Sequence, residues 1–524
     1  MNKKIKIYLP IFIGIAVIIG IVIGSNLNYS NKTALLFGGN KQEEKIKRLI
    51  DYIHYDYVDE VNTDSILDGT LKNIVEKLDP HSVYIPASKH EEIAEKMNGK
   101  FVGIGIQFTI YKDTITVLKT IKNGPSERVG IKAGDRILLA NKDTLYGKNI
   151  TSKGVIAILK GKKDTDVNLT VYRKSENRII PFTVTRSDIP ISSLDAAYML
   201  QKGIGYIKLN SFTDTSFIEF KNALNDLKSE GLETLIVDLR DNPGGFIGKT
   251  RDIVDEFLSD NKLVVFTKNN KGKIHNYFAT QKGGFENGKV YVLINENSAS
   301  AAEIFAGALQ DNDRGIIIGR RSFGKGLVQQ DMDLGDGSSV RLTISRYYTP
   351  TGRSIQKPYK LNHKSEYYGD DFRKRFNSGE LTNKDSIKVA DSLKFTTPKG
   401  KIVYGGGGII PDIFVPIDTS NYFEDFHFRE MSTFVFEYVD ANRKEFENMP
   451  LNYFLDYFDE DEIIYNKYVK KVYGNKKNIK SEKQIKKYIK ALFARELYGE
   501  NAFYQVYNQA DKMIEKVLDL EKNN

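Results

Sequence analysis

Three loops carry the residues that could perform chemistry, and each follows a run of apolar residues. They are residues 238–245 (DLRDNPGG), 295–303 (NENSASAAE) and 319–326 (GRRSFGKG). Ser300 in the second loop is a candidate nucleophile, and Lys325 in the third is a candidate phosphate ligand or general base. Because sites in open α/β sheets lie at the carboxyl ends of strands, we expect the three loops to lie together.

The glycines around Lys325 have the spacing of a phosphate-binding P-loop, with Gly319 and Gly324 in the expected places. A P-loop needs Ser or Thr after the lysine, where this chain has Gly326. It also needs a helix directly afterwards, whose N-terminus binds the phosphate. Residues 326–348 are instead typical of a strand, an Asp-Gly turn and a second strand, which is a hairpin. The sequence therefore argues against nucleotide binding by Lys325.

Ser300 stands at the start of an Ala-rich helix, where a serine is often only an N-cap. Ser298 can supply the cap, and Ser300 would then lie in the first turn of the helix. There the helix dipole and free N–H groups favour a developing negative charge.

A serine nucleophile needs a base, and no His accompanies these loops. A lysine can act as the base if its amine is neutral, which burial favours. The glycines beside Lys325 suit a lysine enclosed against another loop, although a lysine in a surface turn has the same appearance. The Gly-Gly pair of DNPGG either leaves N–H groups for an oxyanion or forms an ordinary tight turn.

Composition excludes several other chemistries. The chain has 524 residues, 40% hydrophobic, so we expect several domains with real cores. It has no Cys, which rules out thiolate catalysis, zinc–thiolate sites, disulfides and a lipoprotein anchor. Its six His have no metal-binding spacing, so we predict neither a metal nor a cofactor. The net charge of +9 indicates solvated helix faces rather than a nucleic-acid surface.

The first 30 residues indicate export. Lys3, Lys4 and Lys6 precede a run without charge that extends from Ile7 to Ser30. Its apolar part is just long enough to span a bilayer, and no clear cleavage site follows. We interpret residues 1–30 as a signal-anchor with the lysines inside, and a cleaved signal peptide is the alternative. The rest of the chain is expected outside the cytoplasm, anchored to the inner membrane, or periplasmic if the segment is cleaved.

Four regions follow this segment. Residues 31–98 have helical periodicity, and residues 99–188 have short β-rich runs that predict a small β domain. Residues 189–420 alternate apolar strands with amphipathic helices, which indicates an α/β domain with a mostly parallel sheet. Residues 421–524 are helical again.

The motifs around the three loops resemble those of a known family. DLRDNPGG, NSASAAEIFAGALQDNDRGIIIGRRSFGKGLVQ and YYTPTGRSIQ together are similar to the C-terminal processing peptidases, the tail-specific serine proteases of family S41. LDPHSVYIP resembles the segment that precedes the PDZ domain in this family, and GIIPDI resembles its closing strand motif. The resemblance covers roughly residues 45–420 and implies a ClpP/crotonase-like α/β protease core, a PDZ domain and helical terminal segments.

The resemblance also implies roles for individual residues. Ser300 would be the nucleophile, Lys325 the general base, and Gln329 the residue that orients the lysine. The backbone N–H groups of Gly245 and Ala301 would form the oxyanion hole, with the adjacent Gly244 as an alternative to Gly245.

The region 99–188 corresponds to the PDZ domain in this resemblance. FVGIGIQF resembles the carboxylate-binding loop, which assigns peptide C-terminus binding to Gly103, Ile104, Gly105 and Ile106. The next strand would accept the peptide by β-augmentation. GPSERVGIKAGDRILLANKD is the most specific PDZ motif in this chain, and a generic small β barrel is the alternative.

Taken with the resemblance, the sequence predicts a serine endopeptidase that recognises protein C-terminal tails and cleaves near them through an acyl-enzyme. Its partners would be proteins or peptides with apolar tails, and the membrane. A catalytically silent PDZ scaffold that only binds tails is the alternative. The extension 421–524 has three open roles: a dimer or adaptor element, a docking surface for a partner, or a cap over the core.

Overall fold

The computed structural model describes residues 14–18, 41–361, 364–418, 425–446, 448–458, 461–474 and 482–522. The predicted signal-anchor, residues 1–30, lies outside this description except for a short helical stretch at 14–18. No helix in the described part of the chain is long and apolar enough to cross a bilayer. The chain forms two compact units, residues 1–74 and 75–524. The first contains α2 (Lys41–Tyr55) and most of α3 (Thr63–Glu76).

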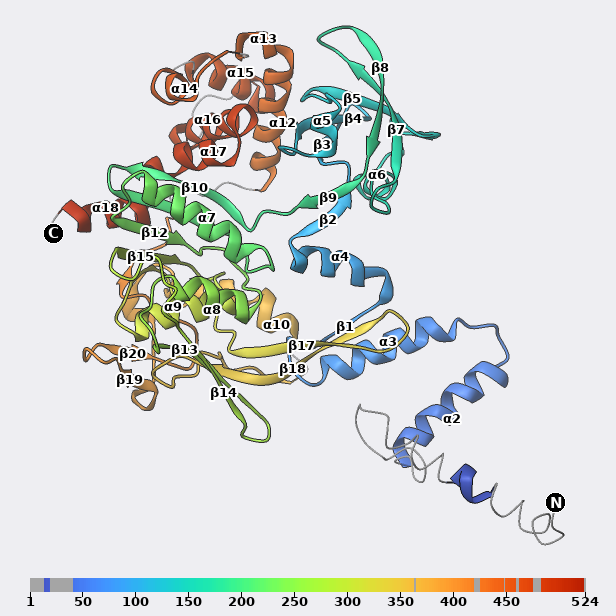
Figure 1. Ribbon diagram of the computed structural model, residues 1–524, viewed down its shortest axis with the longest axis vertical. Helices are drawn as coiled ribbons and strands as arrows, with labels where there is room; N and C mark the ends of the chain where they lie inside the picture. Colours follow the sequence, from blue (N-terminus) through green and yellow to red (C-terminus); the bar gives the residue numbers. More distant parts are fainter. Residues whose placement is uncertain are drawn as a thin grey trace, which may run out of the picture. The chain divides into compact units, whose positions relative to one another are not determined.

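The centre of the second unit is a six-stranded sheet in the order β10-β11-β12-β15-β16-β21 (Figure 1). Its strands are β10 (Leu194–Gln201), β11 (Ile204–Leu209), β12 (Thr234–Asp238), β15 (Lys289–Ile294), β16 (Ile316–Gly319) and β21 (Ile413–Phe414). Only β10 is antiparallel to its neighbour, and every other pair is parallel. The prediction of a mostly parallel sheet is therefore confirmed.

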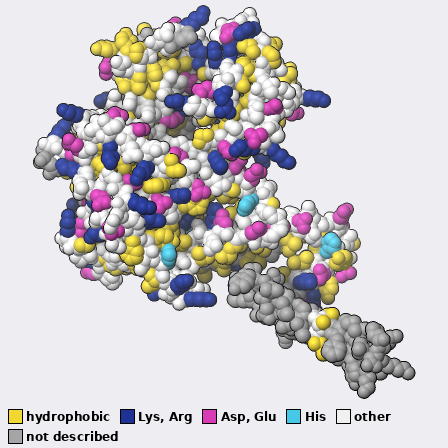
Figure 2. Space-filling model, in the orientation of Figure 1, with side chains coloured by type: hydrophobic (Ala, Val, Ile, Leu, Met, Phe, Trp, Pro, Cys, Tyr) yellow, Lys and Arg dark blue, Asp and Glu magenta, His cyan; other side chains and the backbone are white. Residues whose placement is uncertain are grey.

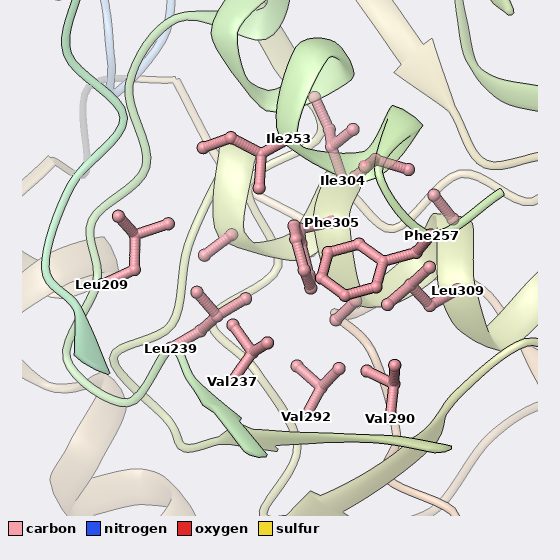
Figure 3. Packing of buried hydrophobic residues seen from close by; sticks show 14 of the residues in the cluster. Leu209, Val237, Leu239, Ile253, Phe257, Val290, Val292, Ile304, Phe305 and Leu309 are labelled. Carbon is pink, nitrogen blue, oxygen red and sulfur yellow. The ribbon is translucent and has the colours of Figure 1, made fainter. Parts of the chain in front are cut away.

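Helices cover one face of this sheet and enclose the main core. They are α7 (Ser216–Ser229), α8 (Ile247–Asp255) and α9 (Ala301–Asp311). In Figure 3, Val237 and Val292 of the sheet point toward Phe305 and Leu309 of α9, with Phe257 beside them. These side chains are fully or almost fully buried, which explains why the central positions of these strands are apolar. Burial of this face holds α9, and therefore Ser300, in place.

The opposite face of the sheet is covered by α18 (Lys512–Lys522), the last helix that the structure describes. Met513, Ile514 and Val517 of α18 pack in one cluster with strand residues such as Tyr206 and Tyr291. Beyond this apolar contact, the Glu521 carboxylate accepts a hydrogen bond from the Tyr291 hydroxyl at 2.8 Å. Of the roles considered for the C-terminal extension, capping the core is the one that α18 performs.

A second, antiparallel sheet carries the hairpin that follows Lys325. Its strands are β1 (Val83–Ile85), β13 (Leu263–Asn269), β14 (Ile274–Phe278), β17 (Leu327–Asp333) and β18 (Ser339–Tyr348). β17 and β18 form the hairpin, and β1 pairs with β18 on the same residues that β17 contacts. The hairpin predicted after Lys325 is confirmed, and the helix that a P-loop requires does not follow it. Smaller elements nearby are β19 (Lys394–Thr396), β20 (Ile402–Tyr404), α10 (Lys364–Gly369) and α11 (Asp371–Asn377).

The region predicted to be a small β domain has its own sheet, in the order β3-β4-β5-β7-β8, with β6 on β5. Its elements are β3 (Ile106–Tyr111), β4 (Thr114–Thr120), α5 (Pro125–Arg128), β5 (Asp135–Ala140), β6 (Asp143–Thr144), α6 (Ser152–Leu159), β7 (Asp166–Arg173) and β8 (Arg178–Thr185). β2 (Lys100–Gly103) pairs with β9 (Ser187–Pro190), and α4 (Ala87–Asn98) precedes them. Within this sheet β3 is an edge strand, so one side of its backbone is not paired in the ladder.

The remaining C-terminal helices form a separate bundle with an aromatic core. They are α12 (Asp425–Ala441), α13 (Arg443–Phe446), α14 (Leu451–Tyr457), α15 (Asp461–Tyr473), α16 (Glu482–Tyr498) and α17 (Glu500–Tyr507). α12 lies beside the small β domain (Figure 1), where Phe436 contacts Tyr111 with ring centroids 5.4 Å apart. In the same contact, the Asp440 carboxylate accepts hydrogen bonds from Arg136, at 2.6 and 3.0 Å, and from Lys174 at 3.0 Å.

Basic and acidic side chains alternate over the visible surface. On the face shown in Figure 2, Lys and Arg side chains lie over the C-terminal helices and over the rest of the molecule, with Asp and Glu between them. Many lysines of the extension bind acidic neighbours, for example Lys486, which bonds Glu462 at 2.5 Å. This arrangement is consistent with the solvated helix faces that the composition predicts.

Candidate active site

Ser300 occupies the position directly before α9 and has an unusual backbone conformation. Its φ is 55° and its ψ is −115°, a region that a non-glycine residue rarely adopts. The backbone N–H of Ser300 donates to Oε2 of Glu303 at 2.8 Å, and its carbonyl accepts from the Tyr347 hydroxyl at 3.0 Å. Strained conformations of this kind persist only where the surroundings impose them, and they cluster at functional sites.

The structure corrects one expectation about the neighbouring serine. Helix α9 begins at Ala301, so Ser300 itself is at the N-cap position and Ser298 is not the cap. The Ser298 hydroxyl instead donates to the carbonyl of Leu239 at 2.8 Å and accepts from the N–H of Asn295 at 2.9 Å. Ser298 therefore joins the loop after β15 to the end of β12. This role of Ser298 depends on the pairing of β12 with β15, which brings Leu239 close to it.

Lys325 is partly buried, and within the described part of the chain its Nζ has one hydrogen-bond partner, which is neutral. Its Nζ donates to Oε1 of Gln329 at 2.7 Å. Burial and, to a smaller extent, the positive charge of Arg341 together lower the pKa of Lys325 to about 8, against the opposing charges of Glu303 and Asp79. An amine with a pKa of about 8 is neutral in roughly a fifth of the molecules near pH 7.4, far more than an ordinary lysine, and only the neutral form can act as a general base.

The acidic side chain of Glu303 joins the serine loop to the lysine loop. Its carboxylate is fully buried and accepts the N–H groups of Gly324 at 2.7 Å and Lys325 at 2.8 Å, in addition to that of Ser300. It also accepts the Ser322 hydroxyl at 2.5 Å. Burial raises the pKa of Glu303 to about 7, although these hydrogen bonds act in the opposite direction.

Glu303 was not among the residues singled out from the sequence. A signal for it exists, because Ser followed three residues later by Glu is the pattern of a capping box, in which the Glu reaches back to the N-cap N–H. That pattern reports the bond to Ser300. It carries no information about the bonds to the lysine loop, which come from another part of the chain.

Gly244 of DNPGG packs against the turn that carries Ser300, and Gly245 packs against Phe212 in the segment after β11. A Cβ on Gly244 would lie 2.7 Å from the backbone nitrogen of Ala301, and a Cβ on Gly245 would lie 2.0 Å from the carbonyl oxygen of Phe212. The N–H of Gly244 donates to Oδ1 of Asn242 at 2.8 Å. The N–H groups of Gly245 and Ala301 have no acceptor among the described residues. Of the two glycines, Gly245 is thus the one with an available donor.

Tyr347 of β18 contacts both the serine loop and the lysine loop. Its buried hydroxyl lies against the carbonyl oxygens of both Ser300 and Lys325. Both of these backbones are therefore bound twice, through their N–H groups by Glu303 and through their carbonyls by Tyr347. The arrangement fixes the two loops relative to each other without using either reactive side chain.

The other predicted group of residues, 103–106, lies apart in the small β domain. The carbonyl of Ile104 accepts the N–H of Ser126 at 3.0 Å and its hydroxyl at 2.7 Å. Gly105 has a φ of 74°, and a Cβ there would come within 3.2 Å of Ile189 and Pro125. The N–H groups of Ile104 and Gly105 find no acceptor in the described part of the chain. The loop thus presents N–H groups next to the open edge of β3.

No cluster of potential metal ligands occurs among the described residues. The described residues of the site supply a hydroxyl, an amine of lowered pKa and two N–H donors.

The chain matches three family models. Residues 203–361 match peptidase family S41, residues 102–184 match the PDZ domain, and residues 429–499 match a family of unknown function. The S41 match includes Ser300, Lys325 and Gln329, and the PDZ match includes the loop 103–106.

Curated relatives are bacterial proteases. The chain is 29% identical over 359 residues to carboxy-terminal processing protease CtpB of Bacillus subtilis, which covers 67% of this chain and 72% of that protein. It is 32% identical over 321 residues to a carboxy-terminal-processing protease of Bartonella bacilliformis, covering 60% and 73%. A probable CtpA-like serine protease of Staphylococcus aureus is 31% identical over 356 residues, covering 66% and 70%.

Among solved structures, the photosystem II D1 C-terminal processing protease is 26% identical, with a TM-score of 0.34, and covers 59% of this chain and 83% of that one. The fold and the family matches define a serine-type peptidase with a PDZ domain. The chain belongs to the carboxy-terminal processing proteases of peptidase family S41.

Proposed function

We propose that this protein is a serine endopeptidase that binds the C-terminal tail of a protein substrate and cleaves near it through a Ser300–Lys325 dyad. The observation that carries the proposal is the pair of loops itself. A strained serine at a helix N-terminus and a lysine whose pKa is lowered to about 8 are bound to the same buried carboxylate. This is the combination of nucleophile and neutral base that acyl transfer needs.

In the acylation step, neutral Lys325 removes the proton from Ser300 Oγ as this oxygen attacks the scissile carbonyl carbon. The oxyanion that forms accepts hydrogen bonds from the N–H groups of Gly245 and Ala301. When the tetrahedral intermediate collapses, the protonated Lys325 gives its proton to the departing amine. The peptide C–N bond breaks and an ester of Ser300 remains.

In the deacylation step, Lys325 is neutral again and takes a proton from a water molecule that attacks the ester. Collapse of the second intermediate returns the proton to Ser300 Oγ and releases the new carboxylate. Gln329 keeps Lys325 directed at the serine through its hydrogen bond to Nζ.

The PDZ domain supplies recognition of the tail in this proposal. The substrate carboxylate binds the N–H groups of the loop Gly103–Ile106, and the residues before it add to β3 as a further strand. The position of β3 at the edge of its sheet supports this. Apolar tails suit the site, because the residues of β3 that pack against the core of this domain are apolar: Ile106, Phe108 and Ile110.

We further propose that the enzyme acts outside the cytoplasm. The run from Ile7 to Ser30 without charge, preceded by three lysines, supports attachment to the inner membrane or export to the periplasm. Fusions of residues 1–40 to a reporter that is active only after export test this. A reporter that stays inactive contradicts it.

The test of the catalytic proposal follows cleavage of an unfolded reporter with an apolar C-terminal tail by the full chain. Ser300→Ala and Lys325→Ala are each expected to reduce kcat by roughly 10³-fold or more, as removal of a member of a catalytic unit does. Blocking the reporter's C-terminal carboxylate as an amide is expected to raise KM. Binding of the tail without cleavage by the wild type would instead indicate a scaffold.

A further inference from the structure

The amide of Gln329 lies between a hydrogen-bond donor and a hydrogen-bond acceptor. Its Oε1 accepts from Lys325 Nζ at 2.7 Å, and its Nε2 donates to the backbone carbonyl of His81 at 2.6 Å. A carbonyl oxygen can only accept, so it determines which end of the amide faces it. The His81 carbonyl therefore turns the oxygen of Gln329 toward the lysine. With the amide reversed, an NH₂ group would face the ammonium group, donor against donor.

The consequence concerns the direction of the lysine lone pair. When Lys325 is neutral, one of its N–H groups is held by Gln329 Oε1, and the lone pair points elsewhere. Without a fixed acceptor, the amine rotates freely and its lone pair is aligned with the serine for only part of the time. A carbonyl 248 positions away in the sequence thus bears on the alignment of the dyad.

The His81 carbonyl is itself held by a small buried turn. Oδ1 of Asp79 accepts the N–H groups of His81 and Ser82, each at 2.8 Å, and Oδ2 accepts the Ser82 hydroxyl at 2.6 Å. Burial acts to raise the pKa of Asp79, but these hydrogen bonds outweigh it and hold the pKa below its ordinary value. Asp79 is therefore charged, and its carboxylate organises the turn.

The turn is also joined to the strand beside Gln329. The N–H of Thr343 in β18 donates to Ser82 Oγ at 3.2 Å, and Thr343 is the residue paired with Gln329 across the hairpin. Directly after the turn, β1 pairs with β18, with Val83 opposite Arg341. One stretch of β18 thus contacts both the turn and Gln329.

The side chain of His81 makes a second connection to the lysine loop. Its Nδ1 is hydrogen bonded to the Tyr368 hydroxyl. Tyr368 in turn stacks on Phe323, with ring centroids 5.7 Å apart and planes inclined by 16°. Phe323 is two residues before Lys325, so the turn contacts the lysine loop through both its backbone and its side chain.

We propose that the Asp79–Ser82 turn is a positioning element of the peptidase, acting on Lys325 through the amide of Gln329. This rests on the proposed dyad and adds to it a part of the chain that lies before the PDZ domain. The turn touches neither substrate nor the reacting atoms. Its effect is on how often the lysine is correctly aligned.

The test is a double-mutant cycle on kcat with Asp79→Ala, Gln329→Ala and the double variant in the full chain. Measurements are made with the reporter peptide at about pH 9, where the lysine of every variant is largely neutral. We expect Asp79→Ala to lower kcat roughly 10-fold and Gln329→Ala to lower it at least as much. The kcat of the double variant should equal that of Gln329→Ala within about twofold, because the turn acts on Lys325 only through the amide that this variant lacks.

A matched control is Asp336→Ala. Asp336 forms a similar turn at the tip of the same hairpin, accepting the N–H of Ser338 at 2.8 Å, but has no contact with Gln329. Its kcat should stay at the wild-type value. The proposal would be overturned if the loss of kcat in the double variant were the product of the two single losses. It would also be overturned if Asp79→Ala raised KM and left kcat unchanged.

The isosteric variant Asp79→Asn gives a second readout that a purely structural role would not move. The charged groups that act on Lys325 are Arg341 of β18, Glu303 of α9 and Asp79. Removing the negative charge of Asp79 should shift the acid limb of the pH–rate profile to lower pH. If Asp79→Ala does not fold, the double-mutant cycle is run with Asp79→Asn and Gln329→Ala, and losses that multiply would overturn the proposal in the same way. Activity retained in Lys325→Ala would refute the dyad itself, a separate outcome.

Discussion

The backbone N–H groups of Ser300 and Lys325 both donate to one carboxylate oxygen, Oε2 of Glu303, each at 2.8 Å. The other oxygen accepts Gly324 and Ser322. Four donors therefore converge on one buried anion. The turn that carries Ser300 and the loop that carries Lys325 are thus held together by a side chain outside the proposed dyad.

Glu303→Gln should weaken both catalysis and stability. A glutamine places an NH₂ group where two donors already point, so one side of the cluster loses its acceptor and the loops separate. We expect kcat to fall roughly 10²-fold, the size of loss that a small misplacement of reacting groups produces. Thermal unfolding should also occur at a lower temperature. Wild-type kcat in a folded Glu303→Gln variant would contradict this account.

The same carboxyl predicts a dependence of stability on pH. Burial raises the pKa of Glu303 from 4.5 to about 7, so the folded protein binds this proton more tightly than the unfolded chain does. The contribution of Glu303 to the free energy of unfolding therefore falls as pH rises from about 4.5 to about 7. Denaturant unfolding of wild type and Glu303→Gln is measured across this range, and the free energy of unfolding of the wild type minus that of the variant should fall as pH rises.

Activity should rise with pH as Lys325 loses its proton. The acid limb of kcat/KM is expected to have its midpoint near pH 8, where burial places the pKa of this lysine. Arg341→Gln removes a positive charge that lowers this pKa, so its limb should move to higher pH. Lys325→Arg should be inactive throughout, since a guanidinium group stays protonated. A limb that does not move in Arg341→Gln would count against Lys325 as the base.

The buried lysine also lowers stability. Its pKa is about 8 when folded against an ordinary value of 10.5, so the unfolded chain binds the proton more tightly between these values. Lys325→Met should therefore raise the unfolding temperature at pH 7, and the gain should shrink as pH approaches about 10. Scanning calorimetry at the two pH values measures this. Equal unfolding temperatures at pH 7 would contradict it.

Gly245→Ala should lower kcat strongly, because the new Cβ would lie 2.0 Å from a backbone oxygen of Phe212. The backbone must move, and the N–H assigned to the oxyanion moves with it. Loss of one such donor typically lowers kcat by about 10²–10³-fold. Gly248→Ala is the matched control, since a Cβ there meets nothing within 4 Å. We expect kcat of the control to be close to that of the wild type.

Asp440→Ala should loosen the contact between the PDZ domain and the C-terminal helices. Asp440 is almost fully buried and binds both Arg136 and Lys174, so its removal leaves Arg136 without its bidentate partner. Hydrogen exchange of α12 and of the turn after β3 should become faster. Glu92→Ala is the control, because its ion pair with Lys96 is exposed and contributes little. Unchanged exchange would show that the apolar contact alone is sufficient.

Much of the active site could be predicted from the sequence because its parts are local. Apolar runs followed by loops located Ser300 and Lys325 at strand ends, and the strand–turn–strand pattern after Lys325 excluded a P-loop. These inferences depend on periodicity and spacing within about twenty residues. The structure bears out the sheet and the hairpin with nearly the same boundaries.

Other features depend on contacts between distant segments, which periodicity does not encode. Whether Ser298 caps α9 or binds Leu239 depends on the strand beside it. Helix α18 has an apolar face in the sequence, but only the packed structure shows that this face covers the central sheet. An apolar helix face in a sequence indicates that the face is buried, but it does not indicate which element covers it.

The sequence by itself determined which groups follow the buried strands of the α/β core: a serine, a lysine and a Gly-Gly pair. Only the tertiary structure decided how these groups are held, through Glu303 between two loops and the His81 carbonyl behind Gln329. The physical reason is that a hydrogen bond depends on distance and direction. Residues far apart in the chain acquire both only when the core has packed.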